Sequence, residues 1–271
     1  MSSDMTQTER EREFHDGWAA SVDPATVDVE GHWKPLGCPE TSWIDERLGD
    51  LHGKKVLDLG CGLGEGAAHF AVRGAEVTAS DLSPGMLEVA QKVAAIRGCM
   101  IHTVVASATD LSALPADEYD VVYAANLLHH VDIAKCIDEV YRVLKPGGVA
   151  AFWDPLLYNP AIQIYRRMAT EVRTVDEHPI RRSDVATIRD RFASIETRTF
   201  WLTSLMIFVK FLVIDRIHPS EDRYWKLVIE TQNRHERFLR VSHRIDRAIL
   251  RAVPPLKWWC WNIAIVAKKD G

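Results

Sequence analysis

One segment constrains the fold of this chain more than any other: residues 56–64, VLDLGCGLG. A short apolar strand that contains a carboxylate leads into a turn with three alternating glycines. Glycine adopts positive φ angles and lets the backbone approach a ligand closely. The helix expected next, from Glu65 to Arg73, presents unpaired N–H groups at its start. This order predicts a strand, a tight turn and a helix arranged around a small-molecule site.

Two carboxylates near this turn indicate which ligand it holds. Dinucleotide enzymes also place glycines after a strand, but they use the longer spacing G-x-G-x-x-G. Here Gly60, Gly62 and Gly64 have the shorter spacing, and Asp58 would lie beside the negative pyrophosphate of a dinucleotide. Asp81 ends the next expected strand, where a carboxylate accepts ribose hydroxyls in nucleotide-binding folds. The pattern therefore favours a ligand with a ribose and a positive charge over NAD.

Strands and helices alternate at short spacing from residue 55 to residue 154. We expect strands at 56–59, 76–80, 101–105, 119–125 and 149–153, and helices at 64–73, 84–97 and 133–144. The alternation predicts an α/β fold with a parallel sheet and helices on both faces. Ligands bind at the carboxyl ends of the strands in such sheets. The polar residues at or near those ends are Asp58, Asp81, Asp110, Asn126 and Asp154.

The pattern changes after Pro155. Further helices are expected at 160–175 and 183–192, and strands at 195–200 and 261–268, with an arginine-rich helical stretch before the last strand. We therefore expect three parts. They are an N-terminal helical cap (1–50), a core (51–202 together with 258–271) and a helical insertion (203–257).

Composition and charge restrict the class of protein. With 47% hydrophobic and 26% charged residues, the chain is typical of a soluble globular protein. The five cysteines form no C-x-x-C pair, which argues against a disulfide scaffold or a structural zinc site. Residues 1–13 lack the apolar core of a secretion signal, so a cytoplasmic location is expected.

The charge is distributed unevenly along the chain. Residues 1–154 carry 12 basic and 25 acidic side chains, a net charge of −13, whereas residues 155–271 carry 21 and 13, a net charge of +8. Two interpretations remain open for this asymmetry. The favoured one is a pair of solvated faces of opposite sign, and the other is a basic half that meets an anionic partner.

Five motifs between residues 53 and 154 resemble, in order and spacing, those of the class I S-adenosylmethionine-dependent methyltransferases. They are VLDLGCGLG (56–64), Asp81-Leu82-Ser83 followed by Met86, Thr109-Asp110-Leu111 followed by Leu114-Pro115, YDVV through NLLHH (119–130), and LKPGG (144–148). The resemblance implies a doubly wound, Rossmann-like, mostly parallel seven-stranded sheet. It is closest in style to small-molecule and lipid methyltransferases, including the quinone C-methyltransferase type, and it implies S-adenosyl-L-methionine as the cofactor.

The resemblance assigns cofactor roles to a defined set of residues. Asp58 and the backbone carbonyl of Asn126 would bind the methionine ammonium, and Asp81 the ribose hydroxyls. Asp110 would bind the adenine amine, with the N–H of Leu111 on a ring nitrogen. The full set is Asp58, Gly60, Cys61, Gly62, Gly64, Asp81, Leu82, Met86, Thr109, Asp110, Leu111 and Asn126. Structural roles compete for several of them: an Asx turn for Asp110, core packing for Met86, turn packing for Cys61, a helix start for Asp81 and turn formation alone for the glycines.

A proton acceptor is needed only if the methyl acceptor must lose a proton. His129 and His130 follow the fourth strand and Asp154 follows the fifth, so a His/Asp pair can form at the mouth of the site. The competing roles are a structural cap for one of the two histidines and a turn residue before Pro155 for Asp154. No metal-ligand set is expected. Residues expected to contact the acceptor or to fold over the cofactor are Tyr158, Arg166, Arg167, Glu177 and His178, and Phe14, His15 and Trp18 from the N-terminal side.

The stretch 199–217, TFWLTSLMIFVKFLVIDRI, is strongly apolar but contains Lys210 and is too short to span a bilayer. Several arginines and the tryptophans at 258, 259 and 261 lie near it or follow it. The favoured interpretation is a helical lid over an apolar pocket. The alternative is peripheral contact of residues 199–261 with an anionic membrane. Both predict a hydrophobic acceptor such as a lipid, prenyl or polyketide-like compound.

More than one class of function fits these features. The first is methyl transfer to a small apolar molecule. The second is cofactor binding without methyl transfer, and a protein methyl acceptor is a further alternative. Nucleic acid is not expected as a partner, because the arginines are not interleaved with enough stacking aromatic residues. The chain is expected to be a monomer or a homodimer.

Overall fold

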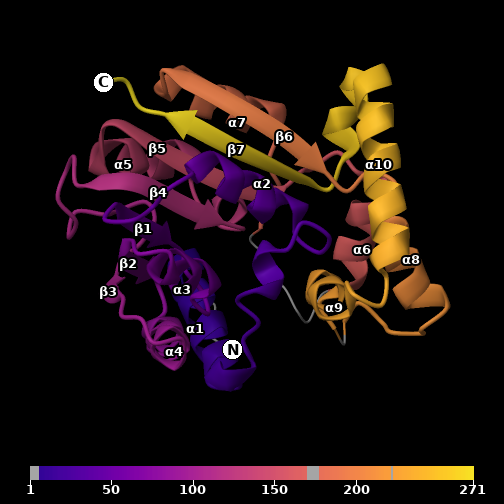
Figure 1. Ribbon diagram of the computed structural model, residues 1–271, viewed down its shortest axis with the longest axis horizontal. Helices are drawn as coiled ribbons and strands as arrows, with labels where there is room; N and C mark the ends of the chain where they lie inside the picture. Colours follow the sequence, from indigo (N-terminus) through magenta and orange to yellow (C-terminus); the bar gives the residue numbers. More distant parts are fainter. Residues whose placement is uncertain (1–5, 170–176, 221) are drawn as a thin grey trace.

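The computed structural model describes residues 6–169, 177–220 and 222–271, and its centre is a seven-stranded sheet (Figure 1). The strand order is β3-β2-β1-β4-β5-β7-β6. The first five strands in this order run parallel, whereas β7 pairs antiparallel with both β5 and β6. The strands are β1 (Lys55–Leu59), β2 (Glu76–Asp81), β3 (His102–Val105), β4 (Tyr119–Ala125), β5 (Leu144–Pro155), β6 (Ser194–Phe200) and β7 (Asn262–Lys268). The expected mostly parallel, seven-stranded sheet is confirmed.

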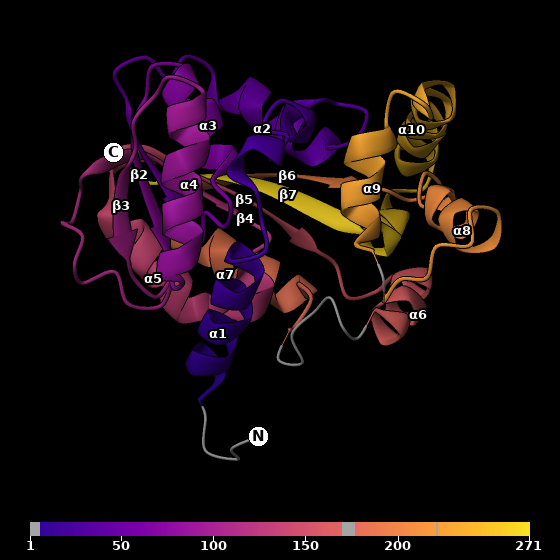
Figure 2. The ribbon, with the colours of Figure 1, turned by 90° about the horizontal axis from the view of Figure 1, so that it is seen from below.

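Helices cover both faces of the sheet, because successive residues of a strand point to opposite sides. Val56 of β1 belongs to the core under α2 and α3, whereas Leu57 belongs to the core under α5 and α7. Figure 2 shows α3 and α4 on one face and α5 and α7 on the other. The bounds are α2 (Pro39–Leu48), α3 (Glu65–Val72), α4 (Pro84–Ile96), α5 (Ile133–Val143) and α7 (Arg182–Arg191). The doubly wound arrangement is confirmed.

The start of α4 follows local capping rules. Ser83 lies in extended conformation, and its hydroxyl accepts the N–H of Met86 at 3.0 Å. Pro84 occupies the first helical position, where its missing N–H has no intrahelical partner to lose. Asp16 of α1 (Gln7–Ala19) accepts hydrogen bonds from the Ser83 hydroxyl and from the N–H of Gly85, the latter at 3.1 Å. The N-terminal helix is therefore attached to the start of α4.

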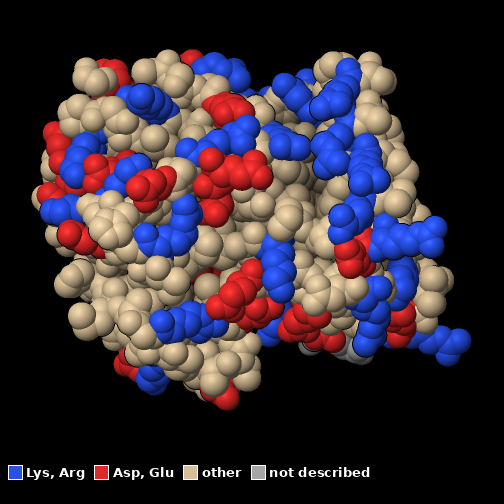
Figure 3. Space-filling model, viewed as in Figure 1, with Lys and Arg blue, Asp and Glu red and all other residues tan. Residues whose placement is uncertain are grey.

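Several helices gather beyond the carboxyl ends of the parallel strands (Figure 1). They are α6 (Pro160–Met168), α8 (Met206–Val213), α9 (Tyr224–Thr231) and α10 (Glu236–Ala252), followed by the 3₁₀ turn η4 (Pro254–Trp259). Gln232 accepts the N–H of Gly37 at 3.1 Å, and His243 contacts the carbonyl of Leu36 at 3.0 Å. These bonds join the segment after β6 to the N-terminal segment, which includes η1 (Pro24–Thr26) and η2 (Gly31–Trp33). Figure 3 shows a row of basic side chains over α10.

Some boundaries differ from the expected ones. β5 begins at Leu144, because α5 ends at Val143 and the LKPGG stretch is already extended. The helix expected at 160–175 ends at Met168, and positions 170–176 lie outside the described residues. The apolar stretch 199–217 is divided between β6, a turn and α8. Within residues 6–169, 177–220 and 222–271, no helix combines the length and the apolar character needed to cross a membrane.

Candidate active site

The turn between β1 and α3 uses backbone angles that glycine adopts easily. Gly60, Gly62 and Gly64 have φ angles of 67°, 52° and 86°. A Cβ on Gly64 would lie 2.6 Å from the Cβ of Ala90 in α4, so this position has no room for a side chain. A Cβ on Gly62 would meet no atom within 4 Å. The turn is thus packed against α4 on one side and open on the other.

Asp58 presents a buried carboxylate next to this turn. The residue is 2% exposed, and its Oδ2 atom has no hydrogen-bond partner in the described part of the chain. Burial raises the pKa of Asp58 to about 8, although the backbone N–H of Ala67 acts in the opposite direction. A buried acceptor without a donor costs about 1–3 kcal/mol. A cationic ligand group at Oδ2 would remove that cost, so the site fits an ammonium group.

Asp81 links the glycine turn to the start of α4. Its Oδ2 accepts the N–H of Gly62 at 3.0 Å, and its Oδ1 accepts the N–H of Ser83 at 2.9 Å. Each carboxylate oxygen can accept a second hydrogen bond. Asp81 therefore orders the turn and keeps capacity for the hydroxyls of a ribose.

Asp110 and Leu111 are engaged within the protein. Asp110 is exposed, and its Oδ1 accepts the N–H of Ser112 at 3.1 Å, which lowers the pKa of Asp110. This is the Asx-turn role that competed with adenine binding. The N–H of Leu111 donates to Oε2 of Glu139 at 2.8 Å. In this structure that N–H is thus engaged within the protein, and its contact with an adenine ring nitrogen stays a prediction.

Ser107 and Ala108 lie closer along the chain to the end of β3 than Asp110 and Leu111 do. Ala106 donates its N–H to the carbonyl of Asp81 at 3.1 Å, which holds the turn after β3 beside the carboxylate expected to bind ribose. Ser107 and Ala108 come next in this turn. The hydroxyl of Ser107 contacts that of Thr109 at 2.9 Å. This turn, three residues before Asp110, therefore lies beside the end of β2, which carries Asp81.

Three members of the expected cofactor set differ in exposure. Met86 is fully buried in a core cluster formed largely by α4, which agrees with the packing role that competed with cofactor contact. Cys61 is buried, and burial raises the pKa of its thiol well above the usual range. Leu82 is half-buried in the turn before α4.

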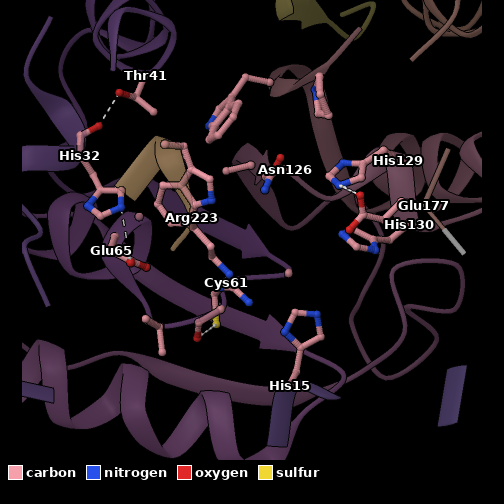
Figure 4. A pocket seen from close by; sticks show the side chains of 18 of the residues that line it. His15, His32, Thr41, Cys61, Glu65, Asn126, His129, His130, Glu177 and Arg223 are labelled. Atoms are coloured by element: carbon pink, nitrogen blue, oxygen red, sulfur yellow. Dashed lines mark hydrogen bonds and ion pairs between the residues drawn. The ribbon is translucent and has the colours of Figure 1, made fainter. Parts of the chain in front are cut away.

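A cavity lies between the glycine turn and the helices at the strand ends (Figure 4). Asp58, Gly60, Cys61 and Gly62 line one side of it. Asn126 also lines it, with a left-handed φ of 56° that is uncommon outside glycine. The aromatic lining residues come from widely separated parts of the chain and include Trp18, Trp33, Trp153, Tyr165, Trp225 and Trp261. The cavity thus joins a polar side at the turn to an aromatic side.

His129 and Asp154 meet in the cavity wall. His129 is 3% exposed, and its Nδ1 lies 2.7 Å from Oδ1 of Asp154, which also accepts the backbone N–H of His129 at 3.2 Å. When Asp154 is ionised, Oδ1 accepts the hydrogen bond and Nδ1 carries the ring proton. Nε2 lies 3.9 Å from Oε2 of Glu177, whose same oxygen pairs with Arg166 at 3.2 Å. Burial raises the pKa of Asp154 to about 8.

His130 lies next to His129 and faces the N-terminal helix. Its Nδ1 lies 3.3 Å from Oε1 of Glu11, and the two histidine rings are 4.1 Å apart between centroids. His129, His130 and Glu177 each offer a ligand atom, and these atoms lie within 4.8 Å of one another. No local sequence pattern predicts this grouping, which arises only in the fold. The ion pair of Glu177 with Arg166 already supplies a positive charge there.

Residues 57–152 match the family model described as "Methyltransferase domain". This chain carries a class I S-adenosylmethionine-dependent methyltransferase domain. Over 148 residues the chain is 37% identical to the ubiquinone biosynthesis O-methyltransferase of Pseudomonas savastanoi pv. phaseolicola. The aligned residues make up 53% of this chain and 63% of that relative. The chain is also 38% identical over 137 residues to the protein of the same name from Pseudomonas putida strain F1, 49% of this chain and 58% of that relative. The match thus spans less than two thirds of either relative.

Solved methyltransferase structures share the fold. One is phosphoethanolamine N-methyltransferase 2 of Haemonchus contortus, solved in complex with S-adenosyl-L-methionine. It is 19% identical to this chain, with a TM-score of 0.58, and the alignment covers 100% of this chain and 62% of that chain. An S-adenosylmethionine-dependent methyltransferase from Archaeoglobus fulgidus is 16% identical with a TM-score of 0.54, covering 86% and 94%. At these identities the likeness concerns the fold of the methyltransferase domain.

The residues expected to contact the acceptor are only partly at the cavity. Phe14, His15 and Trp18 line it, as do Arg166 and Glu177. Tyr158 instead accepts the N–H of Arg182 at 3.1 Å, Arg167 is exposed, and His178 donates its backbone N–H to the carbonyl of His129 at 2.6 Å. The lining residues that sequence reasoning missed include His32, Tyr123, Arg223 and Trp225. No local motif marks them, because the tertiary contacts of the methyltransferase domain bring them in.

Proposed function

We propose that this protein transfers a methyl group from S-adenosylmethionine to a small, largely hydrophobic acceptor in the aromatic side of the cavity. The observation that carries the proposal is the continuity of the cavity. The glycine turn with Asp58, whose Oδ2 has no partner among the described residues, lines the same space as His129, which Asp154 holds. A cation-binding end and an acceptor end therefore share one enclosure, which is what an in-line transfer requires.

The residues around the turn fit each part of the cofactor. Oδ2 of Asp58 would accept the ammonium, Asp81 the ribose hydroxyls, and Ser107 and Ala108 the adenine edge. When bound, S-adenosylmethionine supplies an electrophilic methyl group on a sulfonium, and the protein supplies binding and alignment. Alignment of two reactants in one enclosure raises their effective concentration to on the order of 10⁵–10⁸ M.

We propose that His129 is the base that removes a proton from the methyl acceptor, where the reacting group of that molecule must lose one. Its Nε2 would take the proton, while Asp154 holds the ring by Nδ1 and stabilises the imidazolium. The carboxylate of Glu177, 3.9 Å from Nε2, stabilises the same positive charge. A hydroxyl on an aromatic ring is the acceptor class that best suits a base and aromatic walls, and the names of the curated relatives agree with it.

The decisive experiment measures transfer of a labelled methyl group. Purified protein is incubated with methyl-labelled S-adenosylmethionine and a panel of catechols, prenylated phenols and matched aromatic amines, and then with lipid extracts. We expect labelled methyl ethers of hydrophobic phenols. Tight binding of S-adenosylhomocysteine without a labelled product in the panel or the extracts would favour the alternative, a cofactor-binding protein without methyl transfer.

A second proposal concerns the outer surface of the helices after β6. Exposed apolar side chains of α10 (Phe238, Val241 and Ile245) follow a helical stripe, and α8 exposes Met206, Val209 and Val213. Exposed arginines of α10 lie beside this stripe (Figure 3). We propose that this surface binds an anionic membrane, where a hydrophobic acceptor would be dissolved.

Vesicle sedimentation tests this surface. We expect binding to vesicles rich in phosphatidylglycerol, weaker binding to phosphatidylcholine, and loss of binding in a Val241→Asp/Ile245→Asp variant. Val72→Asp is the matched control, because Val72 is 61% exposed on α3. Equal binding of the two variants would contradict the proposal.

A further inference from the structure

Arg223 brings a positive charge into the cavity from the segment after β6. It directly precedes α9, and it lines the cavity together with residues of the glycine turn. Its guanidinium carbon lies 3.8 Å from the ring centroid of Trp18 and 6.0 Å from that of Phe14. Figure 4 shows the side chain of Arg223 among those that line the cavity, which also include Cys61.

The described charges around Arg223 leave its guanidinium without an anion. Glu177, the carboxylate on the acceptor side, pairs with Arg166 at 3.2 Å, and Glu65 lies 3.7 Å from His32. Among the described residues, no hydrogen bond or ion pair joins Arg223 to a protein acceptor. Partial burial lowers the pKa of Arg223, with Tyr165 and Glu177 acting weakly in the opposite direction. A desolvated cation of this kind is costly unless an anion pairs with it.

Two sets of tertiary contacts hold Arg223 and Trp18 in place. α1, which carries Trp18, is attached to the start of α4 through Asp16. α9 is attached to the N-terminal segment through Gln232, which also donates to the carbonyl of Ile229 at 2.9 Å. The guanidinium is thus stacked on a fixed ring, which leaves its edge N–H groups for a ligand.

We propose that Arg223 is the receptor for a carboxylate bound in this cavity. A guanidinium binds a carboxylate through two parallel hydrogen bonds, a geometry that lysine cannot reproduce. The carboxylate has two sources: the amino-acid end of the cofactor, or an acid group on the methyl acceptor. The first source rests on the proposed function, and the second adds an acidic group to the hydrophobic acceptor proposed above.

The first arm of the experiment uses the cofactor product. Calorimetry compares S-adenosylhomocysteine with its decarboxylated analogue on wild type, Arg223→Gln and Arg223→Lys. If the cofactor supplies the carboxylate, wild type prefers S-adenosylhomocysteine by about ten- to a hundredfold, the range expected for a charged hydrogen bond. The Gln variant loses this preference. Lys226→Gln is the control, because it removes one charge from the exposed Lys226–Glu230 pair of α9.

The second arm uses aromatic acids. Binding of benzoate and phenylacetate, each against its neutral amide, is measured by thermal shift and tryptophan fluorescence with and without S-adenosylhomocysteine. If the acceptor supplies the carboxylate, the acids bind wild type and not Arg223→Gln, and the affinity for S-adenosylhomocysteine is unchanged in the variant.

The expected result in either arm supports a carboxylate receptor at Arg223. The arm in which it is found identifies whether the cofactor or the methyl acceptor supplies the carboxylate. The proposal is overturned if Arg223→Gln, with a wild-type circular dichroism spectrum, retains every preference in both arms. It is also overturned if Arg223→Lys matches wild type in both, because only charge would then matter. Failure of wild type to bind S-adenosylhomocysteine would refute the proposed function separately, while the acid arm without cofactor still decides the role of Arg223.

Discussion

Nδ1 of His129 lies 2.7 Å from Oδ1 of Asp154, and this contact joins the ends of the neighbouring strands β4 and β5. The strand register pairs Ala125 with Trp153, so the residues that follow each strand come close at the same edge of the sheet. The pair is almost completely buried, yet His129 still lines the cavity. A histidine oriented in this way can take a proton at Nε2.

His129→Asn should slow methyl transfer to a phenolic acceptor by about 10²- to 10⁴-fold, the range of general base catalysis. Binding of S-adenosylhomocysteine should change little, since the turn around Asp58 is intact. Single-turnover rates and calorimetry separate the two effects. His130→Gln is the matched control. A wild-type rate in His129→Asn would show that the acceptor loses its proton elsewhere.

Asp58 should make cofactor binding dependent on pH. The pKa of about 8 means that the free carboxyl is largely protonated at neutral pH, whereas an ammonium binds the ionised form. Affinity for S-adenosylhomocysteine should therefore rise between pH 6 and pH 7.5, by up to about tenfold per unit. Asp58→Asn should weaken binding and flatten this dependence in calorimetric titrations. An unchanged slope in the variant would exclude Asp58 as its origin.

The two turns after β3 should differ in their effect on the cofactor. Asp110→Ala should leave the affinity for S-adenosylhomocysteine unchanged, because Asp110 is exposed and bonds to Ser112. Substitution of Ser107, beside the ribose-binding edge, should weaken it by several-fold. Equilibrium dialysis of Ser107→Ala and Asp110→Ala decides which residue contacts adenine, and a larger loss for Asp110→Ala would restore the family-based expectation.

Gly64→Ala should destabilise the fold more than Gly53→Ala does. Both glycines have positive φ angles, 86° and 71°, but only at Gly64 would the new Cβ meet Ala90, at 2.6 Å. Overpacking of this kind costs about 1–3 kcal/mol beyond the backbone strain. Urea unfolding of both variants measures the difference. Equal losses would mean that α4 moves away at little cost.

Glu40 should make stability decrease as the pH rises. It is buried, and it accepts hydrogen bonds from Trp201 at 3.0 Å and Asn262 at 2.8 Å, while burial raises its pKa to about 7. The folded state therefore holds this proton more tightly than the unfolded state. The resulting stability is fully present below the ordinary glutamate pKa and is lost as the pH rises through about 7.

Comparison with Glu40→Gln separates the pH-dependent contribution of Glu40 to stability from the contributions of the other buried carboxyl groups. Between pH 4.5 and pH 7, wild type should lose unfolding free energy relative to the variant, by up to about 1.4 kcal/mol per pH unit. Parallel stability curves for the two proteins would show that Glu40 is ionised in the folded state.

The turn and the sheet were predictable because their signals are local. Three kinds of signal depend on neighbouring residues only. They are apolar runs with period two or with strand length, glycines that need positive φ, and the Ser83-Pro84 helix start. The hydrogen bond of Leu111 was not predictable in this way, because its partner Glu139 is distant in the sequence.

The sequence by itself determined the order of strands and helices, the cofactor turn and the charge of its two carboxylates. Only the tertiary structure decided what lines the rest of the cavity. Arg223 stacks on Trp18, and Glu177 reaches His129, across long separations in the chain. Such contacts depend on how helices pack at the strand ends, and no residue pattern within one segment encodes that packing. The aromatic side of the cavity is therefore a property of the fold, whereas the glycine turn is a property of one short segment.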